Sequence, residues 1–168
     1  MRRLGADDAP ALHALRREAL ERHPLAFGAA PGEDRLRTLE STAELLAPAD
    51  GRVVFGAFRE GRLVGMAGMV RASNQKHRHK AGVWGMYVAP GGRHSGLGRA
   101  LLEALVAEAR RWQGLETVQL SVTAEAPEAL ALYESAGFRV WGREPRSLCW
   151  EGRCADEIYL TLDLRGRA

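Results

Sequence analysis

The sequence has few cysteines and no long hydrophobic run. It has two cysteines, Cys149 and Cys154, and neither has a histidine or a further cysteine at metal-ligand spacing, so no metal site is expected. No apolar stretch approaches the roughly 20 residues that a membrane span needs. The first residues are basic, but no apolar segment follows them. The pattern is therefore not that of a secretory signal, and we expect a cytoplasmic protein.

Lysine is also scarce, although the formal net charge is +3. The only lysines are Lys76 and Lys80, so 22 of the 24 positive residues (24 less 2) are arginines. The one concentrated basic patch is residues 76–80, which has no interleaved aromatic residues. It is typical of a solvated loop, or it lies beside a substrate cleft. The sequence therefore indicates neither nucleic-acid nor membrane binding.

The two cysteines flank a tight turn expected at residues 151–153. They could face each other across a hairpin and form a bridge. Because the cytosol is reducing, we expect free thiols.

The length of 168 residues suits one well-buried α/β domain, and no repeat, low-complexity stretch or linker divides it. We expect a single domain over 1–168, with a helical region at 1–50 and a core at 51–163. Periodicity and turn residues predict helices at 11–22, 35–46, 99–112 and 127–136, and strands at 52–59, 62–70, 81–88, 117–122, 138–143 and 157–163. A strand, a crossover helix and a second strand form a βαβ unit, so those two strands should be parallel. The fold class is mixed α/β: a mostly antiparallel sheet of six to seven strands with helices on both faces.

The most informative segment is residues 93–98, a glycine-rich turn between a strand and a long helix. The first N–H groups of a helix have no intrahelical acceptor, and the helix dipole places partial positive charge there. Such a turn binds anions, most naturally a phosphate or diphosphate. Arg93 and Arg99 bracket the turn and would strengthen it.

A dinucleotide-binding turn is the first alternative. Its third glycine would fall at Leu101, and the turn lies past the middle of the chain, whereas a first βα turn is expected early. The fingerprint is therefore incomplete.

Two segments resemble the signatures of the GNAT family of N-acetyltransferases. The first signature is arginine or glutamine, two free positions, glycine, one free position, then glycine or alanine, and the chain has Arg93, Gly96 and Gly98 there. The second lies one helix and one strand later. Its matching residues are Ala129, Leu132, Tyr133, Gly137 and Phe138, while Ala126 stands where the family often has asparagine. The resemblance covers about residues 50–163.

The resemblance implies transfer of an acetyl group from acetyl-CoA to an amine by direct attack. The residues that would bind the cofactor are Met86, Tyr87, Val88, Arg93, His94, Ser95, Gly96, Leu97, Gly98 and Arg99. In the family, the strand before the turn splays from its parallel neighbour, and a backbone N–H of residues 86–88 would hold the oxyanion. Tyr133 would donate a proton to the departing thiolate. Phe138 is expected to pack back on Tyr133.

The residue that removes the proton of the incoming amine stays open. His77, His79, Glu33, Asp34 and Glu157 are the candidates. The acceptor amine, on a small molecule or peptide, also stays open, as does a homodimer built on the C-terminal strands. Two other classes remain: a CoA-binding regulatory module without catalysis, and a structural subunit of a larger complex.

Overall fold

The computed structural model describes residues 1–166 and contains one seven-stranded sheet. Its strands are β1 (Arg2–Arg3), β2 (Arg52–Arg59), β3 (Arg62–Arg71), β4 (Lys80–Val88), β5 (Thr117–Thr123), β6 (Arg139–Trp150) and β7 (Arg153–Asp163). The spatial order is β1-β2-β3-β4-β5-β7-β6. Every neighbouring pair is antiparallel except β4 and β5, which are parallel. The expected mixed sheet and its parallel βαβ unit are confirmed.

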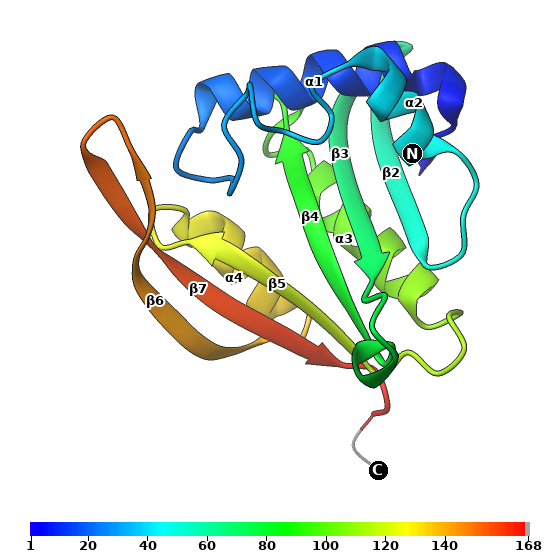
Figure 1. Ribbon diagram of the computed structural model, residues 1–168, viewed down its shortest axis with the longest axis vertical. Coiled ribbons are helices and arrows are strands. Elements are labelled where there is room, and N and C mark those ends of the chain that lie inside the picture. Colours follow the sequence, from blue (N-terminus) through cyan, green and yellow to red (C-terminus); the bar gives the residue numbers. More distant parts are fainter. Residues whose placement is uncertain (167–168) are drawn as a thin grey trace.

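Four α-helices cover the two faces of the sheet (Figure 1). They are α1 (Ala9–Arg22), α2 (Leu39–Leu46), α3 (Leu97–Ala109) and α4 (Pro127–Ser135), with short 3-10 turns at Ala6–Asp8, Gln75–His77 and Pro90–Gly92. Because strand side chains alternate between faces, Val53 packs in one hydrophobic core and Val54 in the other. The first core lies against α3 and α4, and the second against α1 and α2. None of these helices has the length and hydrophobicity that crossing a membrane requires.

Three helices begin away from their expected positions. The first starts at Ala9 rather than at residue 11. The second helix starts at Leu39 rather than at residue 35, because Thr38 Oγ1 accepts the backbone N–H of Ser41 at 3.1 Å and caps the helix there. The third starts at Leu97 and ends at Ala109, where residues 99–112 were predicted. Gly96, with φ of 79°, turns the chain directly into this helix.

The C-terminal hairpin differs most from its prediction. β6 and β7 are continuous strands up to a two-residue turn at Glu151 and Gly152, both with positive φ. Their register places Cys149 opposite Cys154, with Cα atoms 4.0 Å apart, and the two form a disulfide. The expectation of free thiols is therefore wrong: strand pairing brings the two side chains together.

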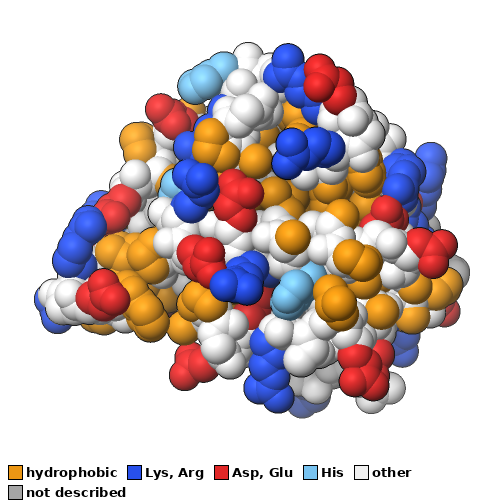
Figure 2. All heavy atoms as spheres, turned by 90° about the horizontal axis from the view of Figure 1, so that it is seen from above, with side chains coloured by type: hydrophobic (Ala, Val, Ile, Leu, Met, Phe, Trp, Pro, Cys, Tyr) orange, Lys and Arg blue, Asp and Glu red, His pale blue; other side chains and the backbone are white. Residues whose placement is uncertain are grey.

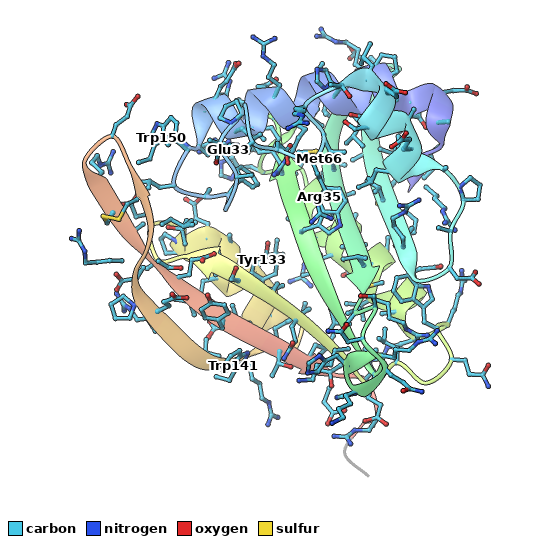
Figure 3. All side chains as sticks on the ribbon, in the orientation of Figure 1. Glu33, Arg35, Met66, Tyr133, Trp141 and Trp150 are labelled. Atoms are coloured by element: carbon cyan, nitrogen blue, oxygen red, sulfur yellow. A yellow bond between two sulfur atoms is a disulfide. The ribbon has the colours of Figure 1, made fainter. Side chains whose placement is uncertain are left out.

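Charges are spread over the surface as the sequence suggested. Figure 2 shows basic and acidic side chains interspersed over one face, with hydrophobic side chains between them. Figure 3 shows Trp141 and Trp150 at opposite ends of the C-terminal hairpin, and both side chains are exposed.

Candidate functional site

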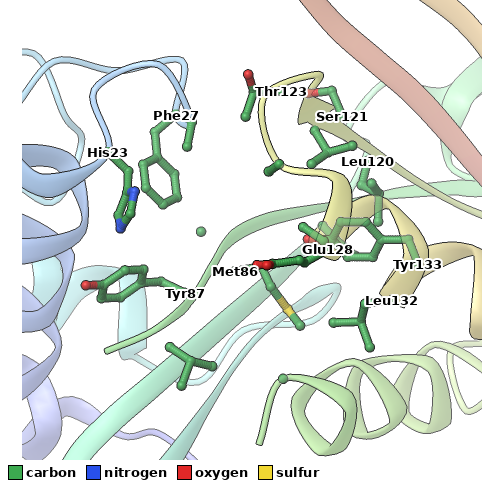
Figure 4. Close-up of a pocket in the computed structure, with 18 of the residues that line it drawn as sticks. His23, Phe27, Met86, Tyr87, Leu120, Ser121, Thr123, Glu128, Leu132 and Tyr133 are labelled. Carbon is green, nitrogen blue, oxygen red and sulfur yellow. The ribbon is translucent and has the colours of Figure 1, made fainter. Parts of the chain in front are cut away.

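The site lies where the two halves of the sheet separate. β4 and β5 are paired only over residues 80–82 with residues 117–119, and beyond these positions they diverge (Figure 1). The gap holds a cavity of about 310 Å³. Its walls come from β4, β5, the start of α4 and the segment that follows α1 (Figure 4). The splayed strand pair expected from the family resemblance is thus present.

The turn before α3 presents unpaired backbone donors at one side of this cavity. Within residues 1–166, no backbone N–H of residues 94–99 donates to a protein acceptor. His94 and Gly96 both have positive φ, at 57° and 79°, so the chain reverses sharply and these groups face outward. A segment with several free N–H groups at a helix N-terminus can hold a diphosphate through its backbone alone.

The two arginines that bracket this turn are engaged elsewhere. The Arg93 guanidinium donates from Nε to the Val88 carbonyl oxygen at 3.1 Å, and its Nη2 lies 2.8 Å from His23 Nε2. Arg99 donates to Ser135 Oγ at 2.9 Å. The backbone N–H groups are therefore the donors of this turn that are free to bind an anion, and the arginine side chains link the turn to His23 after α1 and to α4.

The two signature segments contact each other. A Cβ added to Gly98 would meet Leu132 Cδ2 at 3.4 Å, an ordinary contact distance. Leu132 and Ala126, at the position where the family often has asparagine, both line the cavity. The first turn of α3 therefore packs against α4.

Strand β4 carries a bulge at the cavity wall. Met66 and Gly68 of β3 pair with Tyr87 and Trp84, so Ala67 stands opposite two residues, Gly85 and Met86. Gly85 has φ of 63°, which favours glycine. A bulge re-aims the backbone, and here it does so beside the cavity, in the stretch expected to hold an oxyanion.

Tyr133 lies on the wall opposite Met86 (Figure 4). Its side chain is buried, and burial raises the pKa of the phenol to about 12. The hydroxyl therefore stays protonated at neutral pH. The ring packs on Phe138 with centroids 6.1 Å apart, as the sequence predicted.

His23 is a cavity residue that the sequence reasoning missed. It follows the last residue of α1, and nothing in its local pattern marks it. Burial lowers its pKa, and the positive charges of Arg93 and Arg22 lower it further. Because a guanidinium only donates, His23 Nε2 accepts from Arg93, and the ring is neutral with its proton on Nδ1.

Tyr87 joins the same group of side chains. Its hydroxyl donates to Glu18 Oε1 at 3.0 Å, and its ring centroid lies 5.8 Å from that of His23. Burial and the Glu18 carboxylate raise its pKa. Tyr87 is therefore a neutral donor to α1 and fixes the position of that helix end.

The five proposed base residues are scattered. His77 and His79 precede β4 at its far end, about 20 Å of strand away from Met86. Asp34 is buried in an ion pair with Arg16, whose Nε lies 2.8 Å from its Oδ2.

The other two carboxylates lie closer to the cavity. Glu157 accepts from Ser121 Oγ and Ser147 Oγ, both at 2.7 Å, and Ser121 lines the cavity. Glu33 lies in the loop after α1 (Figure 3) and lines a separate hollow under the tip of the β6–β7 hairpin. The structure brings neither of them together with Tyr133 on the cavity wall.

Comparison with known proteins agrees with this geometry. Residues 12–138 match the family model described as the acetyltransferase (GNAT) family. A search of curated sequences finds no significant match. Among solved structures, a GNAT acetyltransferase from Streptococcus pneumoniae is similar at 25% identity, with a TM-score of 0.86 and 96% and 97% of the two chains covered.

Two further structures are similar. Ribosomal-protein-alanine N-acetyltransferase from Brucella melitensis is 28% identical, with a TM-score of 0.83 and 96% and 98% coverage. The protein yncA from Salmonella typhimurium, solved with its cofactor acetyl-CoA, is 26% identical, with a TM-score of 0.82 and 99% and 94% coverage.

Proposed function

Because the chain belongs to the GNAT family of acetyltransferases, we propose that it transfers the acetyl group of acetyl-CoA to a primary amine of a small molecule or peptide. One observation carries the proposal: a run of free backbone N–H groups lies beside a cavity between two splayed strands. The free N–H groups suit a diphosphate, and the cavity between the splayed strands suits an extended arm that ends in a reactive group. The acceptor class, the residues' roles and the cytoplasmic location are all part of this proposal.

Acetyl-CoA is the cosubstrate that family membership implies, and the residues fit it. The N–H groups of residues 94–99 would bind the diphosphate. The free edge of β4 at residues 86–88 offers backbone groups to the amides of the pantetheine arm. The thioester supplies an activated acetyl group. A backbone N–H at the bulge would hydrogen-bond the oxygen that becomes negative during attack.

Three properties of this chain support direct attack by the amine. Both cysteines are tied together at the hairpin tip, away from the cavity, so neither serves as a nucleophile. Tyr133 stays protonated and can pass its proton to the departing thiolate. His23 is neutral, so it can take the amine's proton when Arg93 turns from it toward the diphosphate.

The helical N-terminal region would form the acceptor side of this single domain. His23 and Phe27 follow α1 and face the cavity across from α4 (Figure 4). We assign residues 1–50 to acceptor binding and residues 51–163 to cofactor binding. A homodimer through β6 remains part of the proposal, because β6 is an edge of the sheet.

The test is release of free CoA thiol from acetyl-CoA in the presence of a broad set of amines. The set should include amino acids, polyamines, aminoglycosides and a peptide with N-terminal alanine, since the Brucella relative is a ribosomal-protein-alanine N-acetyltransferase. Each amine is paired with its N-acetylated form as a blocked control. We expect thiol release with at least one free amine and an N-acetylated product by mass spectrometry. Tight binding of acetyl-CoA with no turnover would instead favour a regulatory CoA-binding module.

A further inference from the structure

Arg16 of α1 is a buried cation with one unused nitrogen. Its side chain is 8% exposed and pairs with Asp34, to which Nε donates at 2.8 Å and Nη2 at 3.4 Å. Its guanidinium carbon lies 4.8 Å from the centroid of the Phe27 ring. The third nitrogen, Nη1, is buried and has no hydrogen-bond partner within residues 1–166. A buried donor without an acceptor destabilises the folded protein, and such donors are rare in native structures. An unpaired Nη1 at this position therefore needs an explanation.

Two other arginines show how a structural arginine behaves in this chain. Arg52 and Arg71 also have an unpaired buried nitrogen, but it is Nε, at the root of a partly exposed side chain. Both use Nη2 to bind backbone carbonyl groups, Arg52 at the C-terminal end of α2 and Arg71 in the loop after α3. Arg16 differs because the whole residue is buried and because its free donor is at the end of the guanidinium group.

The free donor lies behind the cavity wall at the bulge of β4. Nη1 is 3.7 Å from the point where a Cβ on Gly85 would stand, and within residues 1–166 no other non-adjacent heavy atom lies within 4 Å of that point. Gly85 and Phe27 both line the cavity. Gly85 therefore stands between the donor and the cavity, and Nη1 must move toward the cavity to reach a ligand there, because it is closed to solvent in this structure.

The guanidinium group of Arg16 determines which kind of ligand could bind to Nη1. A guanidinium donates and never accepts, so the partner must be an acceptor, and a carboxylate gives the strongest hydrogen bond. Asp34 already occupies the Nε–Nη2 edge, which fixes the group and leaves Nη1 for a second anion. Arg93 adds positive charge at the same end of the cavity.

We propose that Arg16 binds the carboxylate of an acceptor whose amine lies next to it, so that the substrates are free α-amino acids and their close analogues. This inference rests on the proposed acetyltransfer. In an α-amino acid the amine and the carboxylate share one carbon atom. A carboxylate over Gly85 therefore places the amine at the neighbouring bulge, where the thioester oxygen would be held.

The first experiment compares L-amino acids with their own carboxamides as acceptors for the wild-type protein. L-Methionine, L-phenylalanine and L-leucine are used, each beside its amide. Conversion of the carboxylate to a carboxamide lowers the pKa of the neighbouring amine, so more of the amine is neutral and able to attack. Without specific recognition of the carboxylate, the carboxamide would therefore be the better acceptor. We expect kcat/KM to be at least about tenfold higher for the acids, the loss typical of one charge-assisted hydrogen bond.

The second experiment changes the pair itself. The double variant R16Q/D34N removes both charges, so neither partner stays buried and unpaired. We expect its acid-to-amide ratio of kcat/KM to fall by about tenfold or more. The variant R16K keeps the positive charge but lacks the several nitrogen donors of a guanidinium group. Its acid-to-amide ratio of kcat/KM should lie between those of wild type and the double variant. The matched control is R17Q on the exposed side of the same helix, where Arg17 pairs with Glu21, and its ratio should equal that of wild type.

Thermal unfolding and acetyl-CoA binding by calorimetry show whether each variant is folded. If R16Q/D34N does not fold, R16K and the wild-type comparison still decide the question. Equal turnover of acids and amides by wild type overturns the carboxylate proposal and leaves acetyltransfer intact. An unchanged ratio in the double variant also overturns it. Absence of acetyl transfer to every amine overturns the proposed function and this inference together.

Discussion

At the scale of single residues, the cavity contains two titratable groups whose pKa shifts favour their neutral forms. The phenol of Tyr133 is kept neutral by burial, and the imidazole of His23 is kept neutral by burial and by neighbouring arginines. One is a donor and the other an acceptor, and they line the same cavity. Such a pair is what proton transfer to a thiolate and from an amine requires.

Substitution of Tyr133 by phenylalanine tests the donor. We expect kcat to fall by about 10²-fold or more, because a general acid typically contributes at least that much. The affinity for acetyl-CoA should change far less, because the ring and its packing on Phe138 remain. Steady-state kinetics and calorimetry give the two quantities. Unchanged turnover would remove Tyr133 from the mechanism.

Substitution of His23 by glutamine tests the acceptor. The pKa of His23 is lowered in the folded state, so the unfolded chain binds the proton more readily. Folding stability from this group is therefore present above its unfolded pKa of about 6.5 and is lost as the pH falls through the interval below that value. We expect wild type to lose more unfolding free energy than H23Q between pH 7.5 and pH 5, which urea titrations at the two pH values measure.

The same variant should also lose activity. We expect kcat/KM of H23Q to fall by about 10²-fold when His23 accepts the amine's proton. An unchanged kcat/KM would assign the proton to solvent and leave His23 with a positioning role.

At the scale of elements, the turn into α3 is where we propose that the diphosphate binds. Gly96 has φ of 79°, and a Cβ there would meet no non-adjacent atom within 4 Å, so the backbone angle and not space requires glycine. Gly98 has an ordinary angle and an ordinary contact with Leu132. The two glycines of the signature therefore serve different purposes: one shapes the turn, and the other lets α3 approach α4.

Alanine at each position separates these purposes. We expect Gly96→Ala to cost about 1–2 kcal/mol of stability through left-handed strain and to weaken acetyl-CoA binding by turning the N–H groups. Gly98→Ala should stay within about 0.5 kcal/mol of wild type, because its Cβ would make an ordinary contact. Thermal unfolding and calorimetry measure both effects. If the two variants lost the same stability and the same affinity for acetyl-CoA, the different roles of Gly96 and Gly98 would be contradicted.

At the scale of the whole molecule, the two halves of the sheet are joined by few strand pairs. Only three residue pairs link β4 to β5, although β5 pairs with β7 over seven. A ligand between the splayed strands would contact both halves. Its binding should therefore stabilise the molecule as a unit.

We expect acetyl-CoA at 100 times its Kd to add about 2.7 kcal/mol to the unfolding free energy. For a chain of this size, that corresponds to a rise in Tm of roughly 5–10 °C. Differential scanning calorimetry measures it, with Gly96→Ala at the same ligand concentration as the control that should shift less. A saturating concentration without any shift would contradict the position of the cofactor site.

The order and type of the four helices and of β2 to β7 follow from the sequence alone, because alternation and helical periodicity are local patterns. The two-residue strand β1 was not predicted. The glycine-rich turn and Tyr133 were identified in the same way, from signatures that each occupy one short segment. The predicted lengths of the helices and strands were less accurate where periodicity and turn residues were weak. Residues 144–147 include a proline and interrupt alternation. The register with β7 shifts at this segment, and pairing resumes at Leu148 and continues through Cys149.

What only the tertiary structure decided are the contacts between distant segments. His23 meets Arg93 across 70 positions, and Arg16 meets Asp34 across 18. Gly85 comes to lie near Arg16 because α1 packs across β3 and reaches Tyr87 of β4 through Glu18. The disulfide likewise depends on strand register. The periodicity of a segment shows which of its faces is buried, but it does not show which other segment packs against that face. The five candidate bases of the sequence therefore lie outside the cavity lining, while His23, which lines it, has no local sequence signal.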